Sequence, residues 1–487
     1  MVQKLGPGDK KEGQQVQEII IDNFAGGGGA STGIELATGR SVDIAINHDP
    51  AAIAMHEVNH PETVHYQEDV WAVDPREACA GRPVALAWFS PSCTHHSNAA
   101  AGKPKNKQLR GQAWLAVRWA ATVRPRVMIL ENVKEFQTWG PLLENGQPDP
   151  KRKALSYNTF VNAMKRQGYK VETKILKACD YGAPTGRERF FMEMRSDGKP
   201  IVWPEPTHGD PNSPEVLNGQ LRPWRTAAEI IDWSLPCPSI FSRKKPLADK
   251  TLRRIARGIQ KFIVENEEPF IAPNHSETGN LGDKSDMVAA FISKYYGEVS
   301  PTDARGHRID EPLHTITTAN RFALITSHLV KLRGNNTGSA VTDPVPTITA
   351  GGTRIGEVRS FLIKYYGVGV GQDLTEPLHT IPTKDRFGLV IVKGEPYQIA
   401  DIGMRMLQPH ELFAAQGFPD NYVIDVDAAG KKYSKSAQVA RCGNSVPPPF
   451  AEALVRANLP ELCTGSGNNL VLERYSDQEP GQLAFSM

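Results

Sequence analysis

Short apolar runs alternate with segments of helical periodicity through the first 200 residues of the chain. Six runs rich in β-branched or aromatic residues occupy positions 19–21, 41–49, 83–90, 126–133, 169–178 and 188–196. Helical patterning begins near residues 30, 50 and 111, between successive runs. Strands that are buried on both faces read as continuous apolar runs, and strands that alternate with helices form parallel sheets. The pattern therefore predicts an α/β fold with a doubly wound, mostly parallel sheet.

The pattern changes after residue 200, where prolines become dense and a repeat follows. Two stretches, at 291–297 and 311–325, return with few changes at 361–367 and 376–390, and a weaker copy lies between them. Each copy carries a threonine and a lysine at a matched position. The threonines are Thr315, Thr347 and Thr380, and the lysines are Lys294, Lys331 and Lys364. The repeat predicts a β-rich module, in which these lysines either lie on the surface or form a row that faces a ligand.

Helical patterning resumes at 404–419 and 436–459, which predicts that the chain returns to the first domain. The expected division is a flexible tail at 1–17, an α/β domain at 18–200, an inserted β-rich domain at 201–400 with repeats at about 291–392, a return to the α/β domain at 401–462, and a C-terminal tail at 463–487.

The composition is that of an ordinary globular protein. Apolar residues make up 40% and charged residues 23% of the 487, with a formal net charge of +2, which excludes wholesale disorder. No apolar stretch reaches the length of about 18 residues that a membrane span requires, and the polar N-terminus lacks the apolar region of a secretion signal. We therefore expect a cytoplasmic protein with no membrane partner. The six cysteines form no CxxC pair, so neither a zinc knuckle nor a disulfide framework is expected.

A glycine-rich turn follows the first apolar run. Phe24 to Gly29 lie between an expected strand and an expected helix, where glycines allow a ligand to approach the backbone and the helix N-terminus favours a negative group. The alternative is a tight turn without a ligand. The second run ends at Asn47 and Asp49, either of which could hold a ribose, and Asp69 would suit an adenine amino group.

Chemically reactive side chains follow the next runs. Cys93 comes directly after the third run, at the edge of the sheet where ligands bind, and Glu131 ends the fourth, so the two are expected to lie close together. Arg187 and Arg189 share one face of a later strand. The loop at 97–112 is rich in small and basic residues, as in a mobile lid that touches phosphate. These groups favour a site for an anionic heterocyclic substrate, although a buried inert cysteine is the common alternative.

Another motif points to a different chemistry. His56 and His60 satisfy H-E-x-x-H, the pattern of zinc proteases. Pro61 ends the helix directly after His60, and the segment is expected away from the strand ends that carry Cys93 and Glu131. The motif is therefore interpreted as a coincidence.

The order of these motifs resembles the cytosine-C5 DNA methyltransferases. The matching segments are Phe24–Gly29, Pro91–Cys93, Glu131–Val133, Arg187–Arg189, Leu407–Pro419 and Gly443–Pro448. The resemblance covers about 19–200 and 400–460, and 201–400 lies where the family places its target recognition domain. It implies a methyltransferase fold, S-adenosylmethionine as methyl donor with S-adenosylhomocysteine as product, no metal, and double-stranded DNA as partner.

The resemblance also implies a role for each matched residue. Cys93 would attack C6 of a cytosine flipped out of the duplex, Glu131 would protonate or hydrogen-bond the base, and Arg187 and Arg189 would hold its O2 and neighbouring groups. The cofactor residues would be Phe24, Gly26, Gly28, Gly29, Asn47, Asp49, Asp69, Pro91, Asn444, Ser445 and Val446. Apart from the resemblance, the basic loop and the repeat lysines are our candidates for DNA contacts: Ser97, Lys103, Lys105, Lys107, Arg110, Lys294, Lys331 and Lys364.

Three positions depart from the family pattern, and three alternatives stay open. Ser92 replaces the middle proline of Pro-Pro-Cys, Asn47 replaces a glutamate at the ribose position, and Thr185 replaces a glutamine before Arg187. The same chemistry could act on tRNA, although the long region of repeats favours DNA. It could transfer a larger group from a modified donor, or the chain could be a catalytically silent DNA-binding protein. We expect a monomer of bacterial or phage type, with a cognate restriction endonuclease as a candidate partner.

Overall fold

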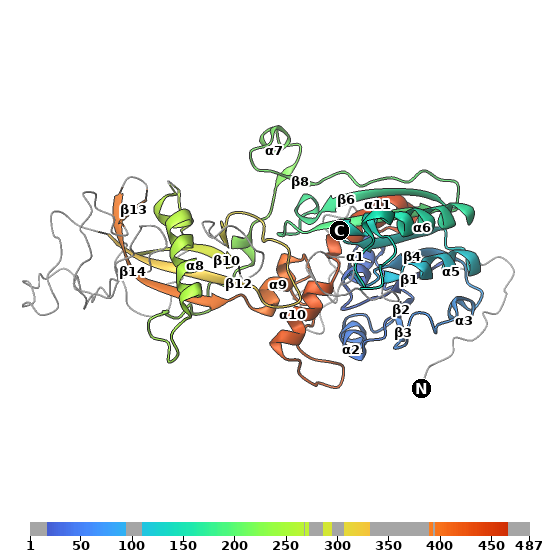
Figure 1. Cartoon of the computed structure of the whole chain (residues 1–487), viewed down its shortest axis with the longest axis horizontal. Coiled ribbons are helices and arrows are strands. Elements are labelled where there is room, and N and C mark those ends of the chain that lie inside the picture. Colours follow the sequence, from blue (N-terminus) through green and yellow to red (C-terminus); the bar gives the residue numbers. More distant parts are fainter. Residues whose placement is uncertain are drawn as a thin grey trace, which may run out of the picture. The chain divides into compact units, whose positions relative to one another are not determined.

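The computed structural model describes residues 17–93, 110–266, 268–271, 286–294, 306–331, 389–392 and 395–465 (Figure 1). The chain forms two compact units. The first comprises residues 1–225, 314–319 and 412–487, and the second comprises residues 226–313 and 320–411. In the part of the chain that the structure describes, no helix has both the length and the apolar character needed to span a membrane.

A seven-stranded sheet forms the centre of the first unit, in the order β3-β2-β1-β4-β5-β7-β6. Its strands are β1 (Ile19–Asn23), β2 (Ile44–Ile46), β3 (Val64–Tyr66), β4 (Val84–Phe89), β5 (Val127–Asn132), β6 (Lys170–Lys177) and β7 (Glu188–Arg195). The first five are parallel, whereas β7 runs antiparallel to both β5 and β6. The doubly wound, mostly parallel sheet predicted from the sequence is confirmed.

Helices cover both faces of this sheet (Figure 1). Along β1, Ile19 and Ile21 pack into one apolar core and Ile20 into the other, because successive side chains of a strand point to opposite faces. The first core includes residues of α3 (Pro75–Cys79), α5 (Trp114–Thr122) and α6 (Leu155–Arg166), and the second includes residues of α1 (Gly29–Thr38) and α11 (Pro448–Asn458). The remaining helices and strands that lie wholly in this unit are α2 (Pro50–Asn59), α7 (Pro214–Leu217), α10 (Lys435–Asn444), β8 (His208–Gly209) and β9 (Arg222–Pro223).

The second unit contains an antiparallel sheet in the order β11-β10-β12-β14-β13. The strands are β10 (Asp286–Lys294), β11 (Gly306–His307), β12 (Phe322–Lys331), β13 (Leu389–Val392) and β14 (Glu395–Met406). Helix α8 (Asp249–Ile259) packs Ile255 and Ile259 against this sheet, and a π-helical turn, Gln260–Val264, continues it. The close approach requires Gly258, since a Cβ atom there would lie 2.2 Å from the Phe291 ring.

Two features of this fold differ from the sequence pattern. Residues 404–406 were expected to begin a helix, but they end β14, because they pair with Ala323–Ile325 of β12; α9 (Pro409–Ala415) begins beyond them. Strand β3 was not expected, because it is only three half-buried residues long. Lys294 ends β10 and Lys331 ends β12, whereas Lys364 and the side chain of Lys331 lie outside the described residues.

Candidate active site

Cys93 lies beyond the carboxyl end of β4, tied to the end of the neighbouring strand β5. The side-chain amide of Asn132 in β5 donates to the Pro91 carbonyl oxygen at 3.0 Å. The main-chain N–H of Ser92 donates to Gln112 Oε1 at 3.1 Å. A proline at position 92 could not make this bond because it has no N–H. The departure from Pro-Pro-Cys therefore adds a hydrogen bond to the turn that carries the thiol.

Glu131 and Arg189 form a buried ion pair whose charges influence the pKa of this thiol. Arg189 Nε lies 2.9 Å from Glu131 Oε1, and each side chain is 10% exposed. The pair joins β5 to β7, and both charges act electrostatically on Cys93. The structure thus brings together the cysteine, the acid and one of the two arginines that the sequence analysis singled out.

The electrostatics of this cluster favour a protonated thiol at rest. Burial raises the pKa of the Cys93 thiol, and Glu131 raises it further, whereas Arg189 and Arg187 lower it. Burial also raises the pKa of Glu131, against the effect of the two arginines. A carboxyl whose pKa is raised is better suited to donate a proton to a bound substrate. The neutral thiol must be deprotonated before it can act as a nucleophile.

Arg187 completes the cluster, but its terminal nitrogens bind the protein itself. The side chain is almost fully buried; Nη1 donates to the Ile316 carbonyl oxygen and Nη2 to the Gly443 carbonyl oxygen, each at 3.0 Å. Burial and the neighbouring Arg189 lower the pKa of Arg187, although a guanidinium stays charged at neutral pH. Arg187 therefore contributes charge to the cluster from a fixed position.

The glycine-rich turn has the backbone geometry that glycines permit. Gly26 and Gly28 have φ angles of +54° and +87°, in the left-handed region, and Phe24 adopts φ +64°. A Cβ atom on Gly29 would lie 2.1 Å from the Val446 carbonyl oxygen. Ser445 and Val446, expected on the methionine side of the cofactor, therefore pack against this turn. Asn444, the last residue of α10, is exposed.

The sequence analysis did not single out Tyr422 or Asn59, which together hold the glycine turn in place, Tyr422 directly and Asn59 through the segment that carries the tyrosine. The Tyr422 hydroxyl donates to the Gly27 carbonyl oxygen at 2.6 Å. A Cβ atom on Gly28 would lie 2.2 Å from that hydroxyl and 3.0 Å from His60 Nε2. Asn59 fixes the tyrosine segment, because its side-chain amide exchanges two hydrogen bonds with the main chain of Val423, both at 2.9 Å.

The polar residues expected around the adenosine follow neighbouring parallel strands. Asn47 follows β2, and its Oδ1 accepts from the N–H of Asp49 at 2.9 Å. Asp49 caps α2 by accepting from the Ala51 N–H at 2.9 Å. Asp69 follows β3 and accepts from the Trp71 N–H at 3.0 Å. All three belong to the edge of the sheet at which the glycine turn and Cys93 lie, because these strands are parallel.

Both histidines of the H-E-x-x-H segment are buried among other polar groups. His56 Nε2 lies 2.9 Å from Ser31 Oγ and its Nδ1 lies 2.8 Å from His65 Nε2. His60 Nδ1 lies 2.8 Å from Glu35 Oε2. Burial lowers the pKa of His60 to about 3, so the ring is neutral at physiological pH. Among the described residues, no group of three His, Cys, Asp or Glu side chains could hold a metal ion.

The residues expected to contact DNA are only partly described. Ser97, Lys103, Lys105 and Lys107 lie outside the described residues, and Lys294 is half-buried. Arg110 is 5% exposed and donates to the Gly140 carbonyl oxygen at 3.2 Å. It therefore braces the loop at 140 and does not present its charge to solvent in this arrangement.

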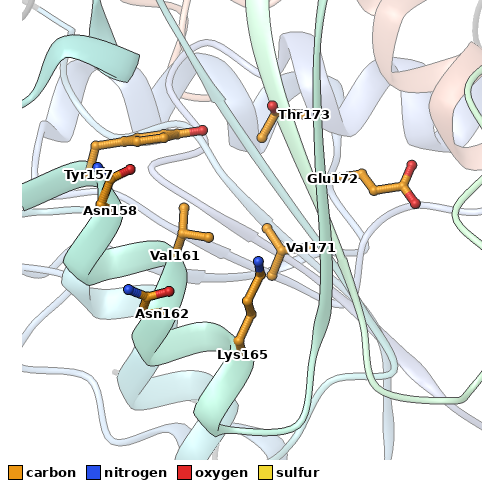
Figure 2. Close-up of a pocket in the computed structure, with 8 residues that line it drawn as sticks. All are labelled: Tyr157, Asn158, Val161, Asn162, Lys165, Val171, Glu172 and Thr173. Carbon is orange, nitrogen blue, oxygen red and sulfur yellow. The ribbon is translucent and has the colours of Figure 1, made fainter. Parts of the chain in front are cut away.

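A hollow of about 420 Å³ lies between α6 and β6, at the edge of the sheet (Figure 2). Tyr157, Asn158 and Lys165 line it from the helix, and Glu172 and Thr173 line it from the strand. Because none of its lining residues belongs to the cluster around Cys93 or to the glycine turn, it plays no part in the site described here.

A glycine turn at the carboxyl edge of a doubly wound sheet, with a thiol and an acid on neighbouring strands, defines a nucleotide-binding α/β enzyme of the group-transfer type. The family model of the C-5 cytosine-specific DNA methylases matches residues 19–230 and 253–459. The chain therefore belongs to this family, which confirms the resemblance read from its motifs. Members of the family are methyltransferases that act on cytosine in DNA.

Two type II methyltransferases and one solved structure are similar to this chain. The type II methyltransferase M.AquIA of Picosynechococcus sp. is 29% identical over 44% of this chain and 88% of its own length. The type II methyltransferase M.AgeI of Thalassovita gelatinovora is 28% identical over 41% of this chain, but the match spans only 45% of that protein. A solved structure of the Entamoeba histolytica methyltransferase EhMeth covers 92% of this chain at 14% identity, with a TM-score of 0.46.

Proposed function

We propose that this chain transfers a methyl group from S-adenosylmethionine to C5 of a cytosine within a specific sequence of duplex DNA. The observation that carries the proposal is the cluster of Cys93, Glu131 and Arg189 at the ends of three neighbouring strands. Membership of the methylase family and similarity to type II methyltransferases support it.

The glycine turn and its surroundings fit the methyl donor. Asn23, directly before Phe24, is fully buried, and neither polar atom of its side chain has a hydrogen-bond partner among the described residues. Buried polar atoms without partners are rare in folded proteins, and they mark a place for a bound group. A Cβ atom on Gly26 would meet only the Phe24 carbonyl oxygen, at 3.8 Å. The open space above the turn supports a ligand there.

Each part of the donor has a candidate partner at this edge of the sheet. Asp69 would bind the adenine, and Asn47 and Asp49 the ribose. We assign the following residues to the methionine moiety and the sulfonium: Phe24, Gly26, Gly28, Gly29, Pro91, Asn444, Ser445 and Val446. S-adenosylmethionine supplies a methyl group on a positively charged sulfur.

The reaction follows from the chemistry of cytosine. C5 is a weak nucleophile, and C6 is mildly electrophilic. Cys93 gives its proton to solvent and adds to C6 while Glu131, in its protonated form, donates a proton to N3, so that C5 becomes nucleophilic and takes the methyl group from the donor, which leaves as S-adenosylhomocysteine. Loss of the C5 proton to water, return of the N3 proton to Glu131 and elimination of the Cys93 thiolate then restore the aromatic ring and release the product. Arg189, paired with Glu131, holds the base at O2 and favours the thiolate.

The base must leave the duplex to reach Cys93, because its C6 atom is covered by stacking inside the helix. We assign sequence recognition to residues 226–411, which contain the repeats. Lys294, Lys331 and Lys364, with Ser97, Lys103, Lys105 and Lys107 of the loop after Cys93, remain our candidates for phosphate contacts.

Covalent trapping tests the proposal. The protein is incubated with a pool of 5-fluorocytosine duplexes and S-adenosylmethionine, followed by intact mass and peptide mapping. Fluorine at C5 cannot leave as a proton does, so the enzyme should remain bonded to DNA through Cys93. Sequencing of the trapped duplexes then identifies the recognised site.

Matched variants and pools separate the alternatives. Cys93→Ser should form no adduct, whereas Cys463→Ser, a partly exposed cysteine elsewhere in the same unit, should form it normally. An adduct with an RNA pool alone would favour tRNA as substrate. Binding of duplex DNA without any adduct would indicate a silent DNA-binding protein, and an added mass larger than methyl on natural cytosine would indicate a different donor.

A further inference from the structure

Six residues of the repeat region belong to the first unit. His314–Ala319 group with the catalytic unit, although the chain on both sides of them, 226–313 and 320–411, forms the second unit. We call these six residues the docked strip. They lie within EPLHTITTANRFALI, the stretch that recurs at 376–390. The strip is therefore the piece of the repeat region that is built into the active-site unit.

Three contacts anchor the docked strip beside the catalytic cluster. Arg187 Nη1 donates to the Ile316 carbonyl oxygen at 3.0 Å, and the Thr185 hydroxyl donates to the His314 carbonyl oxygen at 3.4 Å. Gly443 lies so close that a Cβ atom there would be 2.4 Å from the main-chain carbon of Thr317. These contacts all reach the main chain of the strip, so they depend on its position and not on its side chains.

Arg187 connects the strip with the reacting groups. Its second terminal nitrogen donates to the Gly443 carbonyl oxygen at 3.0 Å, so the guanidinium bridges the strip and the end of α10. Its charge acts on both Cys93 and Glu131. Because Arg187 is only 2% exposed, water cannot readily replace a carbonyl partner if the strip moves away. The location of this charge therefore depends on where the strip lies.

The residues on either side of the strip are held within the second unit. Leu313, directly before it, is fully buried, and the side-chain amide of Asn320, directly after it, donates to the Leu407 carbonyl oxygen at 2.7 Å. A segment of six residues between two fixed ends has little freedom to move alone. A displacement of the recognition unit during DNA binding would consequently be transmitted to the strip.

We propose that the docked strip couples target recognition to catalysis, with Arg187 as the positioning residue that responds to it. This inference rests on the proposed function. It assigns the departure at Thr185 a purpose, since that hydroxyl anchors the strip at His314. In this arrangement Arg187 does not touch the base, and its charge influences the reaction through its electrostatic effect on Cys93 and Glu131. Arg189 is the arginine that holds the base.

Gly443→Ala is the sharpest test, because it displaces the strip without removing any charged group. Gly443 lies in α10 without a positive φ, so alanine suits its backbone. Gly186→Ala is the control, since a Cβ atom beside Arg187 at that position would meet nothing closer than Lys177 Cε at 4.0 Å. For each variant, four quantities are measured. Two are equilibrium affinities, for S-adenosylhomocysteine and for a duplex that carries the site identified by trapping. The others are the rate of adduct formation with 5-fluorocytosine and the pH profile of Cys93 alkylation.

Gly443→Ala should retain both affinities within about 2-fold but form the adduct about 10- to 100-fold more slowly, as small misplacements of reacting groups commonly do. Cys93 alkylation should shift to higher pH because the Arg187 charge has moved. Thr185→Val, which removes only the anchor at His314, should show the same changes to a smaller extent, and it serves as the test if Gly443→Ala fails to fold.

Three outcomes would overturn the coupling. Adduct rates equal to those of Gly186→Ala would show that the strip does not position the site. A loss confined to the affinity for S-adenosylhomocysteine would show that Gly443 acts through the adjacent cofactor residues. An unchanged alkylation profile together with a slow adduct would exclude Arg187 as the link. Failure of the proposed function itself is recognised separately, because the unaltered protein would then form no adduct.

Discussion

The hydroxyl of Tyr422 offers a direct test of how the glycine turn is held. Its hydrogen bond to the Gly27 carbonyl oxygen is 2.6 Å long, and Tyr422 is only 5% exposed. Tyr422→Phe removes the donor and leaves the carbonyl without a partner. An unsatisfied buried group costs about 1–3 kcal/mol. We expect a part of that cost to appear in cofactor binding, because Gly28 and Gly29 depend on the same turn.

If about 1.4 kcal/mol of this cost opposes binding, the dissociation constant for S-adenosylhomocysteine rises about 10-fold. Isothermal titration calorimetry measures this change, and urea unfolding measures the accompanying loss of stability. Tyr169→Phe is the matched control, since the Tyr169 hydroxyl also donates at 2.6 Å to a main-chain carbonyl, that of Pro125, and Tyr169 is 3% exposed. It should lose stability but bind the cofactor normally.

The two tyrosines thereby separate a local from a general effect. Equal stability losses with unchanged affinity in both variants would refute the reasoning, because they would show that the Tyr422 bond supports the fold without shaping the turn. A loss of affinity in both would point to a general loosening of the first unit.

Two further predictions concern buried carboxyl groups. Burial raises the pKa of Glu193 to about 8, so the folded protein holds a proton there that the unfolded chain has already lost above its ordinary pKa of about 4.5, and stability should fall as the pH rises from 5 to 8. Glu193→Gln cannot ionise and keeps an oxygen for the Asn458 amide, so urea midpoints should favour the variant increasingly toward pH 8; a difference that does not change with pH would contradict the assignment. Glu131→Gln removes a charge that raises the pKa of Cys93, so alkylation of Cys93 should shift to lower pH while turnover is lost, and an unshifted profile would place the two groups too far apart to interact.

The sequence predicted most strands of the first unit because buried parallel strands are long and apolar. The run at 83–90 contains β4 and the run at 126–133 contains β5, and these neighbours place Cys93 and Glu131 at one edge. Strand β3 was not predicted because three half-buried residues are too few to show an apolar run or an alternation of apolar and polar positions. Residues 404–406 carry a helical pattern, but pairing with β12 outweighs it.

The parts of the site that were missed depend on contacts between distant segments. Tyr422 and Gly27 are 395 residues apart in the chain, and Arg187 and Ile316 are 129 apart. Neither Tyr422 nor Ile316 stands in a motif with a recognisable chemical purpose, because each is defined by what it touches after folding. Every residue has a main-chain carbonyl, so the role of the Ile316 carbonyl cannot be predicted from the residue type.

Burial gives the Cys93 site a resting state with a neutral thiol. It raises the pKa of Cys93 above its ordinary value, so the proposed nucleophile holds its proton when no base is present. A thiolate exposed to the cell would be oxidised or alkylated, and the neutral form resists both. The two arginines favour the thiolate, but the effect of each is smaller than that of burial. We therefore expect activation to come with the substrate, since only a base that has been flipped out of the duplex places its C6 atom beside Cys93 and its N3 atom beside Glu131.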